Sequence, residues 1–173
     1  MIETYILLFR GINVGGRNIL PMRDLSLLLQ ENGFDEVKTY IQSGNVVLKG
    51  IAKPDASLIA EIESRFGFRP EIIVLDADEF AAAVKHNPYG LADGKSVHFY
   101  FSALEPQPDM DKLVALASEH ERFELKGKVF YLHAPNGIGR SKLVAGLEKC
   151  LGVSATGRNL NTLNKLRQMV EKG

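Results

Sequence analysis

The sequence feature that most constrains the fold is an order of strands and helices that occurs twice. Hydrophobic periodicity, turn residues and helix caps predict the first set from residue 5 to residue 75. Its strands are at 5–9, 37–42, 45–48 and 71–75, and its helices are at 21–32 and 55–66. The second set has strands at 97–101, 123–125, 129–133 and 153–156, and helices at 110–118 and 141–151. Strand–helix–strand–strand–helix–strand is typical of the ferredoxin-like fold. The sequence therefore predicts an α+β protein with two ferredoxin-like (βαββαβ, alpha-beta plait) units.

The segment between the two sets predicts a connection. Asp76 is expected to cap a short helix, and Glu79 follows at the spacing of a capping box. Asn87-Pro88 disfavours continuation of that helix beyond His86. We therefore predict a first unit at residues 1–76, a connecting helix and linker at 77–95, and a second unit at 96–173 whose closing helix covers 160–171.

Composition excludes several classes of protein. Lys plus Arg and Asp plus Glu both count 21 in 173 residues, so no overall positive charge attracts polyanions. The single cysteine, Cys150, excludes an intrachain disulfide and recurs at helical spacing with leucines, which favours a packing role. The four histidines show no metal-ligand spacing, and we expect neither a metal nor a cofactor.

The cellular location follows from the absence of targeting features. The first residues lack the basic region and long apolar core of a signal peptide. No apolar run approaches the length needed to cross a bilayer. We expect a cytoplasmic protein that does not associate with membranes, and the sequence does not indicate its oligomeric state.

The first candidate site is a glycine-rich loop after the first strand. Backbone amides freed by glycines, beside guanidinium groups, are suited to binding an anion. In the predicted topology, this loop shares one sheet edge with the hairpin around Ser43-Gly44. The candidate ligand-binding residues of this edge are Arg10, Asn13, Gly15, Gly16, Arg17, Gln42, Ser43 and Asn45. The alternative is that the glycines and the hairpin residues serve only tight connections.

A second polar cluster is expected at one edge of the second unit. The loop that enters the helix at 141–151 and the end of the last strand both carry glycine and arginine. The candidate residues are Arg140, Ser141, Lys142, Arg158 and Asn159. The alternatives are that Ser141 and Asn159 cap helices and that Arg158 pairs with a carboxylate or with helix carbonyls.

The glycine loop resembles a Walker A loop only in spacing. Gly11 and Gly16 are correctly separated, but Arg17 and Asn18 stand where lysine and serine or threonine bind phosphate and magnesium. The small antiparallel unit is also the wrong scaffold for a nucleotide hydrolase. Ser43 has no visible base, so no catalytic residue is identified, and whether the protein is an enzyme stays open.

A small anionic or phosphorylated ligand is the function that these clusters favour, and two alternatives stand beside it. Aromatic residues on the strands at 97–101 and 129–133 occupy the positions on which RNA-binding sheets stack bases, although Phe99, Phe101, Phe130 and Leu132 also suit a core facing the helices. The first alternative is therefore a nucleic-acid-binding module that uses the sheet face. The second is a protein-interaction module whose loops contact another protein or a second copy of this chain.

Several stretches resemble the bacterial proteins of domain-of-unknown-function family 1697. They are Phe9-Arg10-Gly11-Ile12-Asn13-Val14-Gly15-Gly16, Thr39-Tyr40-Ile41-Gln42-Ser43-Gly44-Asn45-Val46, Asn87-Pro88, Arg140-Ser141-Lys142-Leu143 and Thr156-Gly157-Arg158-Asn159-Leu160-Asn161-Thr162. Leu160 departs from the aromatic residue and Gly157 from the threonine or alanine expected there. The resemblance implies two ferredoxin-like domains, in agreement with the pattern of elements, and implies no function.

Overall fold

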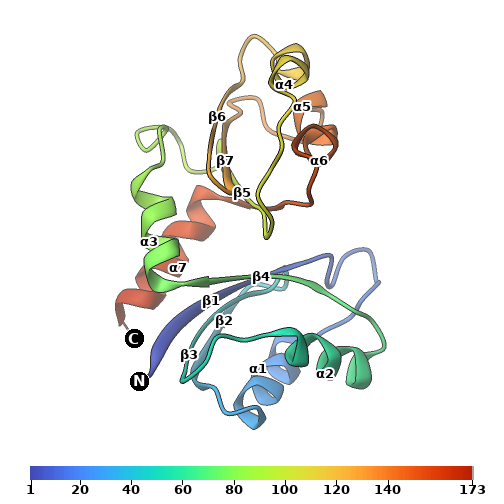
Figure 1. Ribbon diagram of the computed structural model, residues 1–173, viewed down its shortest axis with the longest axis vertical. Coiled ribbons are helices and arrows are strands. Elements are labelled where there is room, and N and C mark those ends of the chain that lie inside the picture. The colour runs from blue at the N-terminus through green and yellow to red at the C-terminus, as the bar shows by residue number, and fades with distance from the viewer. Residues whose placement is uncertain (173) are drawn as a thin grey trace. The chain divides into compact units, whose positions relative to one another are not determined.

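The computed structural model describes residues 1–172, which contain eight strands and seven helices (Figure 1). The strands are β1 Glu3–Arg10, β2 Asp35–Tyr40, β3 Asn45–Gly50, β4 Glu71–Asp76, β5 Val97–Phe101, β6 Arg122–Lys126, β7 Val129–His133 and β8 Thr156–Asn159. The helices are α1 Met22–Glu31, α2 Ala56–Phe66, α3 Ala77–Lys85, α4 Met110–Leu116, α5 Lys142–Ala145, α6 Leu147–Leu151 and α7 Leu160–Lys172. The protein is thus a mixed α+β structure with two four-stranded antiparallel sheets.

The first sheet has the strand order β2-β3-β1-β4, and α1 and α2 cover one of its faces (Figure 1). Alternate residues of β1, including Leu7 and Phe9, pack with Leu25 of α1 and Ile62 of α2 in one buried cluster. Capping residues begin and end α2. The Asp55 carboxylate accepts a hydrogen bond from the Ser57 backbone N–H at 3.0 Å, and α2 ends at a left-handed glycine.

The second sheet repeats this arrangement with the order β6-β7-β5-β8 and with α4, α5 and α6 on one face (Figure 1). Its core joins Tyr100 of β5 and Phe130 of β7 to Leu113 of α4 and Leu147 of α6. Cys150 is buried in the same cluster, so the packing role predicted for it is confirmed.

Three details of the second unit differ from the sequence prediction. The helix predicted at 141–151 is interrupted at Gly146, where a Cβ would lie 2.9 Å from Leu116 Cδ1 of α4. The last strand covers Thr156–Asn159 rather than 153–156. The core facing the helices takes Tyr100 from β5, whereas Phe99 and Phe101 occupy the alternate positions and therefore face the other side of the sheet.

The described chain forms two compact units. One comprises Met1–Ala82 together with the residues from Lys165 onward, and the other comprises Ala83–Asn164. Helices α3 and α7 each begin in one unit and end in the other. The capping box predicted before α3 is confirmed, since Glu79 N–H donates to Asp76 Oδ1 at 2.7 Å and Asp76 N–H donates to Glu79 Oε1 at 3.1 Å. The limits predicted for the domains stay predictions.

Replacement of Tyr131 by phenylalanine tests the packing of the second sheet on its other face. The buried Tyr131 hydroxyl donates to the Ala83 carbonyl at 2.6 Å. Loss of this bond leaves a buried carbonyl without that donor, and we expect the free energy of unfolding to fall by about 1–3 kcal/mol. Urea unfolding of Tyr131→Phe against wild type measures the change. Tyr89→Phe is the control, because no hydrogen bond of the Tyr89 hydroxyl is found within residues 1–172. Equal loss in both variants would contradict the prediction.

Candidate functional site

The structure brings the two polar segments of the first unit together, as the topology predicts. The loop after β1 and the turn between β2 and β3 lie at one edge of the sheet. Asn13 Nδ2 donates to the Gln42 carbonyl at 2.9 Å, and Phe9 N–H donates to the Gly44 carbonyl at 2.9 Å. The glycine loop and the hairpin turn therefore form one continuous rim.

Most polar groups of this rim hold the rim itself. The Asn13 side chain also donates to the Leu20 carbonyl at 2.8 Å and accepts from the Leu20 N–H at 2.7 Å. Buried Asn45 donates to the Tyr40 carbonyl at 3.0 Å and to Ser43 Oγ at 3.3 Å. The structural alternative therefore accounts for the Asn13 and Asn45 amide groups and for the contacts of Ser43 and Gln42.

The two arginines of the rim differ in their surroundings. Arg10 forms an ion pair with Glu71 at 3.2 Å, so a carboxylate already compensates its charge. Gly15 and Gly16 have positive φ in a tight turn closed by the Arg17 N–H, which donates to the Val14 carbonyl at 3.0 Å. The Arg17 side chain is exposed and has no ion pair within the described part of the chain.

In the second unit, the ends of β7 and β8 meet at one sheet edge. The register pairs His133 with Val97 and Asn159 with His98, which places both strand ends beside the start of β5. Asn159 Oδ1 accepts a hydrogen bond from the Thr162 N–H at 2.9 Å, which is the capping role considered for it. The shared edge is thus confirmed, and the Asn159 side chain caps α7.

Arg158 belongs to the opposite face of that sheet. Gly157 faces Tyr100, so its neighbour Arg158 points to the side away from α4, α5 and α6. Arg158 Nη1 donates to the Gly157 carbonyl at 2.8 Å. Desolvation by burial lowers the pKa of its guanidinium to about 10. The structure therefore does not bring Arg158 together with Arg140.

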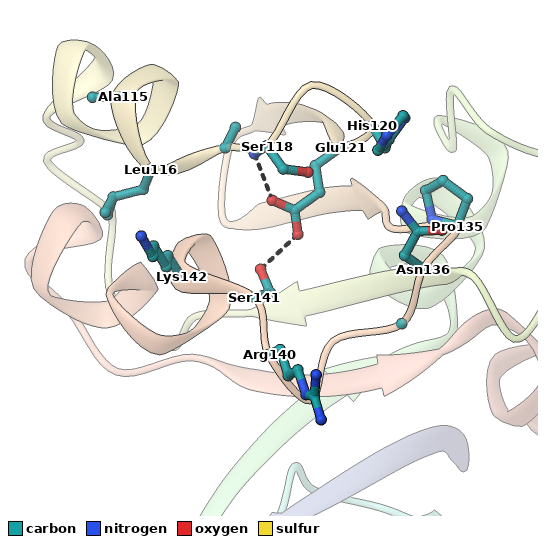
Figure 2. Close-up of a pocket in the computed structure, with 12 residues that line it drawn as sticks. Ala115, Leu116, Ser118, His120, Glu121, Pro135, Asn136, Arg140, Ser141 and Lys142 are labelled. Carbon is teal, nitrogen blue, oxygen red and sulfur yellow. Dashed lines mark hydrogen bonds between the residues drawn. The ribbon is translucent and has the colours of Figure 1, made fainter.

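Arg140, Ser141 and Lys142 do share a site, because all three line an open pocket of about 410 Å³. The pocket lies between two segments of the second unit, one running from the end of α4 to the start of β6 and the other from the end of β7 to the start of α5 (Figure 2). Its volume falls in the range of pockets that hold small organic ligands.

A carboxylate ties the two walls of this pocket together. Glu121 Oε1 accepts from the Ser118 N–H at 2.9 Å, and Glu121 Oε2 accepts from Ser141 Oγ at 2.6 Å. Ser141 Oγ also accepts from the Val144 N–H at 3.1 Å, so it caps α5 as considered from the sequence. Figure 2 shows the Glu121 carboxylate between Ser118 and Ser141.

Two cationic side chains, Arg140 and Lys142, line the pocket. Within residues 1–172, neither Arg140 nor Lys142 forms an ion pair, and both side chains are exposed. Figure 2 shows the Arg140 guanidinium directed away from Glu121. His120 also lines the pocket but lies 3.2 Å from Glu119. With one carboxylate in the lining against two unpaired cations, the pocket offers an anion a favourable charge balance.

Sequence reasoning missed Ser118, His120 and Glu121. Ser118 and Glu121 stand at the Ser-x-x-Glu spacing of a capping box, which predicts a local backbone bond but not the contact with Ser141. That contact joins residues 20 positions apart in the sequence and depends on how the two loops approach each other. The sequence alone does not contain this tertiary contact, so it could not indicate that Glu121 belongs to the pocket.

The aromatic residues considered for RNA stacking are buried. Phe99, Phe101, Phe130 and Tyr131 are each at most 1% exposed. Phe99 packs edge-to-face on Tyr131 with ring centroids 4.7 Å apart, and Phe130 belongs to the helix-side core. Stacking of bases requires exposed ring faces, so these side chains do not offer such a platform.

The described residues contain neither a cluster of metal-ligand side chains nor a membrane-spanning helix. Within residues 1–172, no group of three or more His, Cys, Asp or Glu side chains is arranged to hold a metal ion. No helix in that range combines the length and apolar character needed to cross a bilayer.

Comparisons with known proteins place the chain in a family. A family model described as "Protein of unknown function (DUF1697)" matches residues 2–131. The structure is similar to that of the conserved bacterial protein SP0830 from Streptococcus pneumoniae, with a TM-score of 0.68 and 27% sequence identity over 98% of this chain and 99% of that chain. Comparison with the curated proteins gave no match. The resemblance noted in the sequence is thereby confirmed: the chain belongs to the DUF1697 family of proteins of unknown function.

Proposed function

We propose that the protein binds a small anionic or phosphorylated ligand in the pocket lined by Arg140, Ser141 and Lys142. The observation that carries the proposal is a pair of exposed cations that line a pocket of about 410 Å³ and form no ion pair with any residue from 1 to 172. Guanidinium and ammonium groups provide several donors for phosphate oxygens, and a concave site excludes part of the competing water. Asn13, Asn45 and Arg10 of the first unit already have partners. The proposed ligand therefore binds at the pocket of the second unit and not at the rim of the first.

We further propose that each unit is a ferredoxin-like unit. The strand orders β2-β3-β1-β4 and β6-β7-β5-β8 support it, because each sheet places its first strand between its third and fourth. Helices connect the first strand to the second and the third to the fourth in both units. In such a unit, loops at one sheet edge are close in space although they are distant in sequence. The cytoplasmic location stays a prediction.

Titration with inorganic phosphate tests the binding proposal. Isothermal calorimetry at low salt should show binding to the wild type, with affinity that falls as the salt concentration rises. We expect the double variant Arg140→Ala/Lys142→Ala to bind phosphate at least about tenfold more weakly, because charge-assisted hydrogen bonds are lost. Lys149→Ala is the control, since Lys149 is an exposed residue of α6 outside the pocket lining.

Two results would contradict the proposal. One is the absence of phosphate binding by the wild type. The other is an unchanged affinity in the Arg140→Ala/Lys142→Ala variant, which would place any anion site elsewhere. Circular dichroism spectra of all variants show whether the fold is retained.

A further inference from the structure

Three buried polar atoms without a hydrogen-bond partner lie in a row along β5 and its continuation. Within residues 1–172, the atoms are His98 Nε2, Tyr100 Oη and Ser102 Oγ. Their residues are 9%, 8% and 5% exposed. They stand at alternate positions, and the backbone N–H of Ser102 continues the pairing by donating to the Lys128 carbonyl at 3.0 Å. Alternate positions share one face of a strand, so the three side chains form one polar row, His98-Tyr100-Ser102, on the side of α4, α5 and α6.

The chemistry of the row is that of a neutral donor and a neutral acceptor. Desolvation raises the pKa of Tyr100 to about 12, so its hydroxyl stays protonated and can donate. Desolvation lowers the pKa of His98, and a backbone hydrogen bond with Lys95 acts in the opposite direction, as expected for a ring N–H that donates to a carbonyl. Nε2 of a neutral ring is then an acceptor. The two rings have centroids 6.4 Å apart.

The row begins at the sheet edge to which both pocket segments are connected. His98 pairs with Leu132, one residue before the end of β7, and that strand end leads into the wall with Arg140. The other wall ends at Arg122, which pairs with His133 at the same edge. Glu121, which lines the pocket, is close enough to Tyr100 to contribute to its raised pKa.

A buried polar atom without a partner costs free energy, and native structures contain few of them. Three such atoms lie on one strand face here. His98 is at the sheet edge that leads into the pocket wall, whereas Ser102 is at the opposite end of the strand. The His98 and Tyr100 atoms, together with cations that form no ion pair within residues 1–172, point to a ligand with groups for both. We propose that the pocket and the polar row form one site for a hydroxylated organic phosphate. This inference rests on the proposed function. Arg140 and Lys142 bind the phosphate group, and His98 Nε2 and the Tyr100 hydroxyl bind neutral hydroxyl groups of the same molecule.

Glu121 connects the pocket to the polar row, because it lines the pocket and its charge contributes to the raised pKa of Tyr100. Neither His98 nor Tyr100 is in the lining of the open pocket, whereas Glu121 and Ser141 are. In the proposed complex, the ligand displaces the Glu121 carboxylate from Ser141 Oγ, which lies 2.6 Å from it. The departing carboxylate leaves the Ser141 hydroxyl and the Ser118 N–H as donors for the ligand.

Calorimetric titrations of the full chain with inorganic phosphate, glycerol 3-phosphate, ribose 5-phosphate and glucose 6-phosphate test the proposal. We expect at least one hydroxylated phosphate to bind about tenfold more tightly than inorganic phosphate. Tyr100→Phe keeps the ring and removes the hydroxyl. It should weaken binding of that ligand about fivefold, as loss of one net hydrogen bond does, and leave inorganic phosphate unchanged. Tyr89→Phe is the matched control and should change neither affinity.

Glu121→Gln removes the carboxylate charge and should strengthen binding of both inorganic phosphate and the selected organic phosphate. Three results would overturn the inference alone: no organic phosphate binds more tightly than inorganic phosphate, Tyr100→Phe lowers both affinities equally, or Glu121→Gln leaves both unchanged. The proposed function survives these results as long as phosphate binding depends on Arg140 and Lys142. Absence of binding by any anion would instead overturn the proposed function, and the inference with it.

Discussion

Replacement of Gly44 by alanine is expected to lower the free energy of unfolding by about 2–5 kcal/mol. Gly44 has φ of 92°, a left-handed conformation that an alanine adopts only with strain. A Cβ at this position would also lie 2.6 Å from Phe9 Cβ and 2.7 Å from Ile12 Cδ1. Both contacts involve the fully buried core of the first unit, so neither neighbour can move without loss of packing.

Gly16→Ala separates the two causes. Gly16 also has positive φ, of 74°, but nothing lies within 4 Å of the position of its Cβ. Its replacement should therefore cost only the backbone strain, about 1–2 kcal/mol. Urea unfolding followed by circular dichroism and by tyrosine fluorescence measures both variants. If Gly44→Ala and Gly16→Ala lose the same stability, the close approach of the hairpin turn to Phe9 has no energetic consequence.

The contact between the glycine loop and the hairpin illustrates what could be predicted from the sequence. The order of elements follows from hydrophobic periodicity, and the order alone implies that the end of β1 and the β2–β3 turn share an edge. The Asn13–Gln42 hydrogen bond at 2.9 Å and the Phe9–Gly44 hydrogen bond at 2.9 Å confirm this. Caps are equally local, which is why the roles of Asp76 and Glu79 could be predicted.

The errors arose where a neighbour distant in the sequence decides the outcome. Leucines at helical spacing predict a continuous helix at 141–151, but the helix is interrupted at Gly146, where a Cβ would lie 2.9 Å from Leu116 Cδ1 of α4. The assignment of Phe99 to the helix-side core was wrong for a related reason. Every residue of β5 is buried, so its sequence has no alternation that would distinguish the two faces.

The polar residues of the candidate sites could not be assigned to a binding or a structural role from the sequence. Asparagine, serine and glycine suit both a bound anion and a tight turn, because both uses need the same donors and backbone angles. The geometry assigns Asn13 to the loop and Ser141 to a helix cap, whereas Arg140 and Lys142 line an open pocket. Only the partner of each side chain separates the two interpretations, and the partner is a tertiary property.

Asn13→Ala is expected to lower the free energy of unfolding by about 3 kcal/mol. The side chain donates to the Leu20 and Gln42 carbonyls at 2.8 and 2.9 Å and accepts from the Leu20 N–H at 2.7 Å. Its φ of 54° adds backbone strain, since alanine tolerates this region less well than asparagine. The variant removes the link between the glycine loop, the start of α1 and the hairpin.

Asn18→Ala is the matched control, because Asn18 has nearly the same φ of 52° but, within the described part of the chain, a single side-chain hydrogen bond, to the Gly11 carbonyl at 2.9 Å. We expect it to lose about 1–2 kcal/mol less stability than Asn13→Ala. Hydrogen exchange gives a second measurement, since the Leu20 amide should exchange faster in Asn13→Ala alone. If the Asn13 amide group were a ligand donor rather than a loop anchor, its removal would weaken phosphate binding at little cost in stability. We expect the opposite: a less stable first unit, with the phosphate affinity of the pocket beside Arg140 unchanged at temperatures where the variant is folded.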